Sequence, residues 1–127
     1  MRLKKILLLS SFVFITFQLN AQIPDGIIQG FKKGDAAALA GFFNQNIQMT
    51  ILENEDVFSK AQAQQIVLNF FSKNKVAEFN IKHQGGKDDA RFAVGDLKAA
   101  GGNFRVVIFY KKAGDKTFIH HLRIEKP

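Results

Sequence analysis

Phe104-Arg105-Val106-Val107-Ile108-Phe109-Tyr110 and Phe118-Ile119-His120-His121-Leu122-Arg123-Ile124 decide the fold class of this chain, because apolar side chains recur at every second position. Two shorter runs of the same kind occupy residues 79–83 and 91–96, and segments that contain glycine separate the four runs. A period of two is typical of half-buried antiparallel strands joined by hairpins. Residues 79–124 therefore predict a four-stranded meander.

Two short helices are predicted near the start of the chain. Pro24 is a favoured first residue of a helix, and Gly34 follows the Lys32-Lys33 pair that is typical of a helix end. Asp35 is then a predicted N-cap for a second helix over residues 36–44.

A small hairpin and a third helix should come next. Residues 47–51 alternate as in a strand, and the polar turn 53–56 leads to Val57 and Phe58. Ser59 and Gln62 have the spacing of a capping box, which predicts a helix that ends near residues 73–74. Its apolar face contains Ala63, Ile66, Val67, Phe70 and Phe71.

This order of elements predicts an α+β domain with a cone-shaped, curled antiparallel sheet. The sheet would combine the four-strand C-terminal meander with the N-terminal hairpin, and about three helices would pack on one face. The order resembles the nuclear transport factor 2-like (SnoaL-like) superfamily, a cystatin-like α+β fold, over nearly all of residues 23–126. The segments IPDGIIQGFKKGDA (23–36), IKHQG (81–85) and LRIEK (122–126) resemble an exported Bacteroidota-type family known only as a domain of unknown function.

Residues 1–21 have the three parts of a secretory signal peptide: a basic start, an apolar run over 6–19 and Ala21 as a small residue for cleavage. The alternative is an uncleaved membrane anchor, but a span needs roughly twenty apolar residues. We expect cleavage near Ala21 and export to the periplasm or the extracellular space. Residues 22–127 would then form a single domain, with membrane contact only through an uncleaved leader.

Composition narrows the possible chemistry. The chain has no cysteine, so disulfides and thiolate metal sites are excluded. The net charge of +7 falls to +4 when Arg2, Lys4 and Lys5 leave with the leader, so nucleic-acid binding is not expected. Neighbouring residues on a strand face opposite ways, so His120 and His121 would not chelate one ion together, and we predict no metal and no cofactor.

Alternate residues of a strand face the same side of the sheet, and this pattern predicts a pocket on the face that the helices cover. We expect Tyr110 opposite Phe118 and Ile108 opposite His120, which brings Tyr110 within reach of His120. The same register puts Phe92 beside Ile108 and Ile81 beside Phe92. The candidate pocket residues are Tyr110, His120, Ile108, Phe92, Ile81, Phe118 and His83. A blander interpretation is that Tyr110 and His120 only hydrogen-bond each other or a buried water.

The opposite face of the sheet is predicted to carry an apolar stripe with a basic rim. It would consist of Arg105, Val107, Phe109, Ile119, His121 and Arg123. Such a stripe favours a homodimer, and sheet-to-sheet dimers are common in the superfamily that the chain resembles. The alternative is that these are scattered surface residues.

These observations favour a non-catalytic exported domain that binds a small apolar or amphipathic molecule or a protein partner. One alternative is an isomerase- or dehydratase-type enzyme that uses His120 and Tyr110. Catalytic members of the superfamily place a carboxylate beside such groups, whereas Asp96 is predicted at the other end of the sheet, near Phe104. A second alternative is a basic surface that binds envelope polyanions through Lys32, Lys33, Lys111, Lys112 and Lys116.

Overall fold

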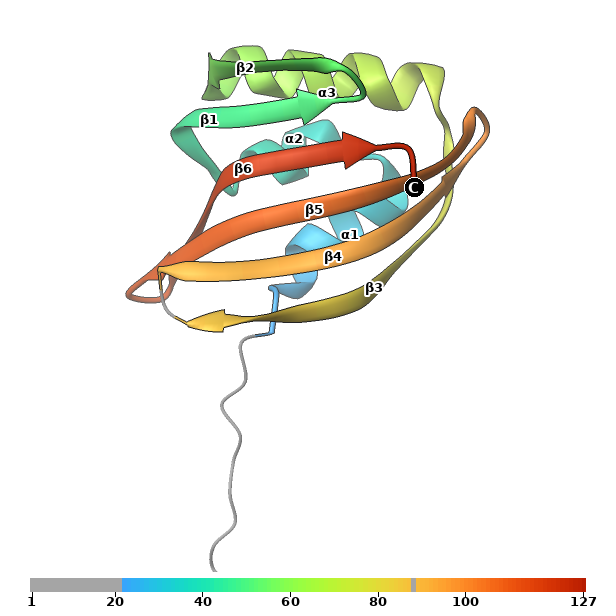
Figure 1. The fold of residues 1–127 in the computed structure, drawn as a ribbon. Coiled ribbons are helices and arrows are strands. Elements are labelled where there is room, and N and C mark those ends of the chain that lie inside the picture. The colour runs from blue at the N-terminus through green and yellow to red at the C-terminus, as the bar shows by residue number, and fades with distance from the viewer. Residues whose placement is uncertain (1–21, 88) are drawn as a thin grey trace, which may run out of the picture.

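Six strands form one curled, unclosed sheet in the computed structural model, which describes residues 22–87 and 89–127 (Figure 1). The strands are β1 (Phe43–Ile51), β2 (Asn54–Ser59), β3 (Val76–Lys87), β4 (Ala90–Ala99), β5 (Gly102–Ala113) and β6 (Lys116–Glu125). Their order across the sheet is β2-β1-β6-β5-β4-β3. The pairs β3–β4, β4–β5 and β5–β6 are antiparallel, so the predicted meander is confirmed.

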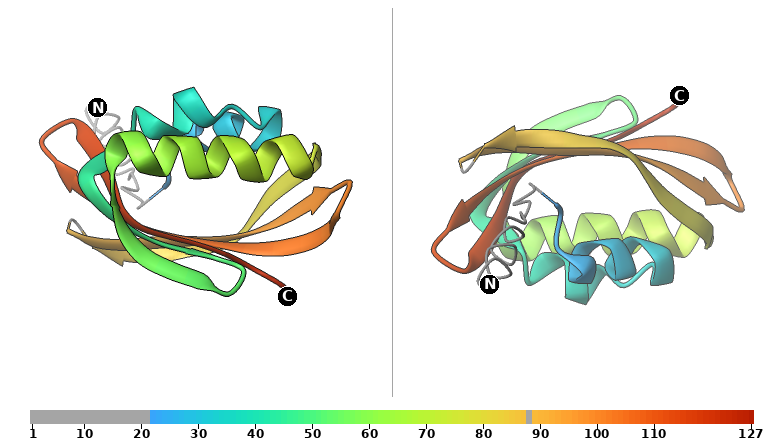
Figure 2. Two further views of the ribbon diagram at one scale, coloured as in Figure 1. Left: turned by 90° about the horizontal axis from the view of Figure 1, so that it is seen from above. Right: turned by 90° about the horizontal axis from the view of Figure 1, so that it is seen from below.

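Three helices lie together on the concave side of the sheet (Figure 2). They are α1 (Asp25–Lys33), α2 (Ala36–Ala40) and α3 (Lys60–Lys73). Local signals set their ends: Gly34 is left-handed with φ of 62°, and the Asp35 carboxylate accepts a hydrogen bond from the Ala38 N–H at 3.0 Å. The predicted capping box of Ser59 and Gln62 is present. This arrangement confirms the α+β fold class, and none of the helices in the described residues is long and apolar enough to cross a membrane.

The second helix is shorter than predicted. It ends at Ala40, and Phe43 begins β1 instead of continuing a helix to residue 44. The cause is a long-range contact, because β1 pairs in parallel with β6 and the Phe42 carbonyl accepts a hydrogen bond from the Ile119 N–H at 2.7 Å. Pairing with the last strand overrides the local helical pattern.

The predicted register between β5 and β6 is wrong. Tyr110 pairs with Ile119 and Ile108 pairs with Leu122, because the register shifts next to Phe109. His120 is the extra residue of this β-bulge. Ile119 and Leu122 are therefore both fully buried, although residues three positions apart in a regular strand face opposite sides. Ile119 therefore belongs to the core, and the prediction that it lies on the outer face is also wrong.

The predicted register between β4 and β5 is wrong as well. Ala93, not Phe92, pairs with Ile108, and Phe92 pairs with Phe109 on the outer face. The two-residue turn Ala100-Gly101 fixes this register, and a slip of one residue exchanges the faces of a whole strand. Ile81 pairs with Gly95 rather than lying beside Phe92.

Aromatic rings connect the helices to the sheet. The rings of Phe31 and Phe79 stack with their centroids 4.9 Å apart, and Phe31 also contacts Phe71 edge-on at 6.2 Å. Phe71 contacts Phe70 at 5.8 Å, and Phe70 contacts Phe104 at 5.1 Å. This aromatic chain joins α1, α3, β3 and β5 and makes up much of the core.

The Phe79 ring packs closely against β4 because Gly95 has no side chain. A Cβ atom at Gly95 would lie 2.7 Å from that ring. We therefore expect Gly95→Ala to reduce the free energy of unfolding by about 1–3 kcal/mol through overpacking, measured by urea denaturation. Gly85→Ala is the matched control, because its Cβ would lie 3.2 Å from the half-buried ring of Phe92, which has room to move. Equal losses in the two variants would contradict this account.

Candidate functional site

The structure separates the residues that were predicted to share a pocket. Tyr110 and Ile108 are 0% exposed and fill the core, and Ile81 packs against it. His83 is exposed, and Phe92 lies on the outer face. Phe118 is half-buried and lines a hollow at the β5–β6 hairpin with Pro24 and Phe42, apart from Tyr110. The four cavities described below have neither Tyr110 nor His120 in their walls.

Arg91 is the polar neighbour of Tyr110. The two residues pair across β4 and β5, and their side chains are hydrogen-bonded. Burial is the largest influence on the Tyr110 hydroxyl and raises its pKa, while the charge and hydrogen bond of Arg91 act in the opposite direction. Sequence analysis missed this pair because it depends on the register of β4 and β5.

His120 occupies the bulge, where its side chain is half-buried. Burial lowers the pKa of His120, and the nearby positive charge of Lys111 lowers it further. Within the described residues, no three histidine, aspartate or glutamate side chains are grouped so that they could hold a metal ion.

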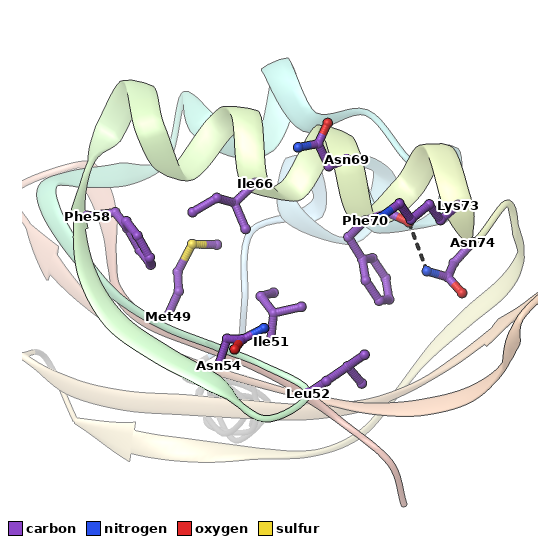
Figure 3. Close-up of a pocket in the computed structure, with 10 residues that line it drawn as sticks. All are labelled: Met49, Ile51, Leu52, Asn54, Phe58, Ile66, Asn69, Phe70, Lys73 and Asn74. Carbon is purple, nitrogen blue, oxygen red and sulfur yellow. Dashed lines mark hydrogen bonds between the residues drawn. The ribbon is translucent and has the colours of Figure 1, made fainter.

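A cleft of about 370 Å³ lies between α3 and the β1–β2 hairpin (Figure 3). Met49, Ile51, Phe58, Ile66 and Phe70 form its apolar part, and we call these five residues the cleft floor. The other lining residues are Leu52, Asn54, Asn69, Lys73 and Asn74. The cleft is thus apolar inside and carries amides and one ammonium group at its rim.

The local sequence explains why these side chains of α3 and β1 line the cleft. Ile66, Asn69, Phe70 and Lys73 have the spacing i, i+3, i+4 and i+7 that places side chains along one face of α3. On the facing strand, Met49 and Ile51 point to the same side because they are two residues apart. The side-chain amide of Asn74 donates to the Phe70 carbonyl at 3.0 Å and holds the C-terminal end of α3 at the cleft.

The lining of the cleft is poor in catalytic groups. None of the ten described residues that line it is a histidine, carboxylic acid, tyrosine, serine or threonine. Among the ten, Lys73 is the one side chain of a type that can act as a general acid or base. The chemistry available here is apolar contact, amide hydrogen bonding and one positive charge.

Leu52 stands at the mouth of the cleft in an unusual backbone conformation. Its φ is 58°, its side chain is 41% exposed, and its N–H donates to the Ile124 carbonyl at 2.7 Å. Leu52 also lines an adjoining hollow of about 510 Å³ together with Glu53, Asn54 and Lys126. The turn was predicted over residues 53–56, but it lies at Leu52 and Glu53, and β2 begins at Asn54. The sequence contains no signal that leucine would adopt this conformation.

The outer face of the sheet carries two neighbouring cross-strand rows. One row runs Val57, Gln48, His121, Phe109, Phe92 and Gly85. The other runs Glu55, Thr50, Arg123, Val107, Val94 and His83. The rings of Phe109 and His121 stack at 5.2 Å, and the Arg123 Nε donates to Glu125 at 2.7 Å. Apart from Ile119, the residues of the predicted stripe have this outer-face register, and Arg105 pairs with Glu125 next to the rows.

The lysines of the predicted basic surface lie in two places. Lys32 and Lys33 belong to the last turn of α1. Lys112 and Lys116 line a hollow of about 650 Å³ at the β5–β6 hairpin, together with Lys60 and Asp115. A fourth cavity, of about 230 Å³, lies near Phe104 and Pro127.

Known proteins share this fold and much of this sequence. Residues 24–125 match the family model described as domain of unknown function DUF4783. A DUF4783 protein of Bacteroides ovatus is similar at 36% identity, with a TM-score of 0.78 over 83% of this chain and 96% of that one. The comparison with curated proteins gave no match.

More distant structures show the fold alone. A protein of Nostoc punctiforme with a cystatin-like fold is 8% identical, with a TM-score of 0.64 over 81% of this chain and 72% of that one. A protein described as Rd1NTF2_04 with long sheet is 19% identical, with a TM-score of 0.63 over 79% of this chain and 94% of that one. The resemblance to the nuclear transport factor 2-like fold is confirmed.

His120, in the bulge, and its neighbour His121 should make the stability of the fold depend on pH. Burial lowers the pKa of His121 below 6.5, and the charge of Arg123 lowers it further, against smaller opposite effects of Glu55 and Glu125. Since His120 is lowered too, the unfolded chain takes up these protons at a higher pH than the folded one. The free energy of unfolding should therefore fall as pH decreases from about 7.5 through 6.5.

Urea denaturation at several pH values between about 7.5 and 5.5 tests this dependence. The double variant His120→Gln/His121→Gln should show a smaller loss over that interval than the original protein, because neither side chain can then bind a proton. His83→Gln, which changes an exposed histidine, is the control. If the double variant kept the full pH dependence, the two histidines would not be its source.

Proposed function

The chain belongs to the DUF4783 family, whose description states no function, and we propose that it is a non-catalytic domain that binds a small amphipathic molecule. The proposed site is the cleft between α3 and the β1–β2 hairpin. The observation that carries the proposal is the division of this cleft into an apolar floor and a polar rim. At about 370 Å³ it lies at the lower end of the range of ligand pockets, which starts at about 300 Å³.

This site replaces the pocket predicted around Tyr110 and His120. The enzyme alternative needs both side chains in one cavity. Tyr110 is fully enclosed beside Arg91, and the bulge separates His120 from the inward-facing positions Ile119 and Leu122. The α3 cleft is open and has a graded polarity, so it is the better candidate for a ligand.

Export is part of the proposal. The predicted leader, residues 1–21, lies outside the described residues, and the family match begins at residue 24. Ile23 is already anchored, since it is 5% exposed and its N–H donates to the Gln84 Oε1 at 2.7 Å. A mature chain that starts at Gln22 would keep this anchor and every helix and strand.

Filling the cleft tests the site. Ile66→Trp adds a large ring to the floor, and we expect it to weaken binding of the neutral amphipathic dye prodan at least tenfold, or about 1.4 kcal/mol, in a fluorescence titration. Leu68→Trp is the matched control, because Leu68 is 47% exposed and does not line the cleft. Urea denaturation would check that both variants fold. Unchanged dye binding in Ile66→Trp would rule the cleft out.

The outer face favours a second proposal, a homodimer through the sheet. Phe92 and Phe109 are neighbours across two strands, as are Val94 and Val107, and all four are half-buried rather than enclosed. The row through Val107 ends in Glu55 on β2 and His83 on β3. A two-fold axis along the strands would lay the acidic end of one copy over the opposite end of the other.

A charge on the stripe tests the dimer. We expect the original protein to sediment as a dimer at tens of micromolar and Phe109→Glu to sediment as a monomer, because the substitution buries a carboxylate in the interface. Leu68→Glu adds the same charge on α3 and should leave the dimer intact. Sedimentation of the original protein as a monomer at this concentration would refute the dimer.

A further inference from the structure

The charged group of the α3 cleft lies at one end. Figure 3 shows Phe58, Met49 and Asn54 toward one end and Phe70, Leu52, Lys73 and Asn74 toward the other. A ligand with an apolar chain would lie along this axis with its chain toward Phe58. Its head group would then lie near the C-terminal end of α3.

The charge of the residues that line the cleft indicates which kind of head group it would bind. Lys73 is the one charged residue among the ten described residues that line the cleft, and none of the ten is acidic. The ion pairs found between described side chains join Lys82 with Asp96 and Arg123 with Glu125, away from this wall. A cationic head would meet an uncompensated ammonium group, whereas an anionic head would gain a charge-assisted hydrogen bond.

We infer that the cleft binds a single-chain amphiphile with a carboxylate head, held at Lys73, and that Leu52 covers the part of its chain next to the head. This inference rests on the function proposed above and specifies its ligand class. Asn69, one helical turn before Lys73, is a further polar residue at the rim of the cleft. The apolar chain lies on the cleft floor.

Leu52 supplies a second, independent observation. Leu52 has a φ of 58°, in the left-handed region that side chains such as leucine rarely adopt, and Asn or Gly would fit this turn better. The leucine side chain is instead kept at the mouth of the cleft, where it is 41% exposed. A strained residue that presents apolar surface to an open cavity is expected where contact with a ligand maintains it.

Lys73 also has a plain structural explanation. A lysine in the last turn of a helix interacts favourably with the helix dipole, whatever the cleft binds. That role predicts a small loss of stability on substitution but no change in which head group is preferred. Head-group preference therefore separates the two roles.

The test compares three ten-carbon probes, decanoate, decanol and decylammonium, by displacement of prodan. We expect decanoate to bind about fivefold more tightly than decanol, the size of a partly exposed ion pair, and decylammonium to bind most weakly. Lys73→Gln should abolish the preference for decanoate, and Lys73→Glu should reverse the order of the two charged probes. Lys32→Glu, on α1, changes the net charge equally and should keep the original order.

The variant Leu52→Asn tests the role of Leu52 in binding. It should raise or preserve the free energy of unfolding, because asparagine tolerates the left-handed conformation, and yet weaken binding of decanoate and decanol by a similar factor. Unchanged affinity in this variant would overturn the role of Leu52. Equal binding of decanoate and decanol to the original protein, or an unchanged order in Lys73→Glu, would overturn the preference for a carboxylate head. Either result would leave the proposal of a ligand-binding cleft in place. Failure of all three probes to bind would overturn the proposed function itself.

Discussion

The stacking of Phe31 on Phe79 is the contact on which the rest of this structure depends. It fixes α1 against β3, and the contacts that follow through Phe71 and Phe70 to Phe104 fix α3 against β5. Phe70 has two roles, because it belongs to this aromatic chain through Phe71 and Phe104 and also forms part of the cleft floor. The same packing that closes the core under β3 to β5 therefore leaves the space between α3 and the β1–β2 hairpin open.

Sequence patterns predicted the parts of the fold that depend on neighbouring residues. The capping box of Ser59 and Gln62, the cap at Asp35 and the alternation in β5 are such local signals, and each is present in the structure. The bulge at His120 is different, since a period of two carries no mark of one inserted residue. The early end of α2 has a similar cause, because the pairing of Phe43 with β6 spans most of the domain.

The candidate site was harder to predict for the same reason. The apolar face of α3 was expected, but the sequence does not say which of its residues a strand will cover. Val67 became fully buried, whereas Ile66 and Phe70 line an opening, because the β1–β2 hairpin lies at a distance from the C-terminal half of α3. The predicted pair of Tyr110 and His120 required a regular register between β5 and β6, and the bulge at His120 gives a different one. The outer-face stripe was predicted better, with Ile119 as the error and Phe92 as the omission.

The parallel pairing of β1 with β6 has a consequence for how this chain assembles. β6 is the last strand in the sequence but the third in the sheet, between β1 and β5, so the C-terminal residues form the middle of the structure. Until they are in place, the β1–β2 hairpin has no neighbour in the meander, and the helices have only part of a surface to cover. Contacts between such distant segments slow folding, because the chain between them must first be ordered. A growing chain would therefore hold two unconnected pieces of sheet until the ten residues of β6 join them.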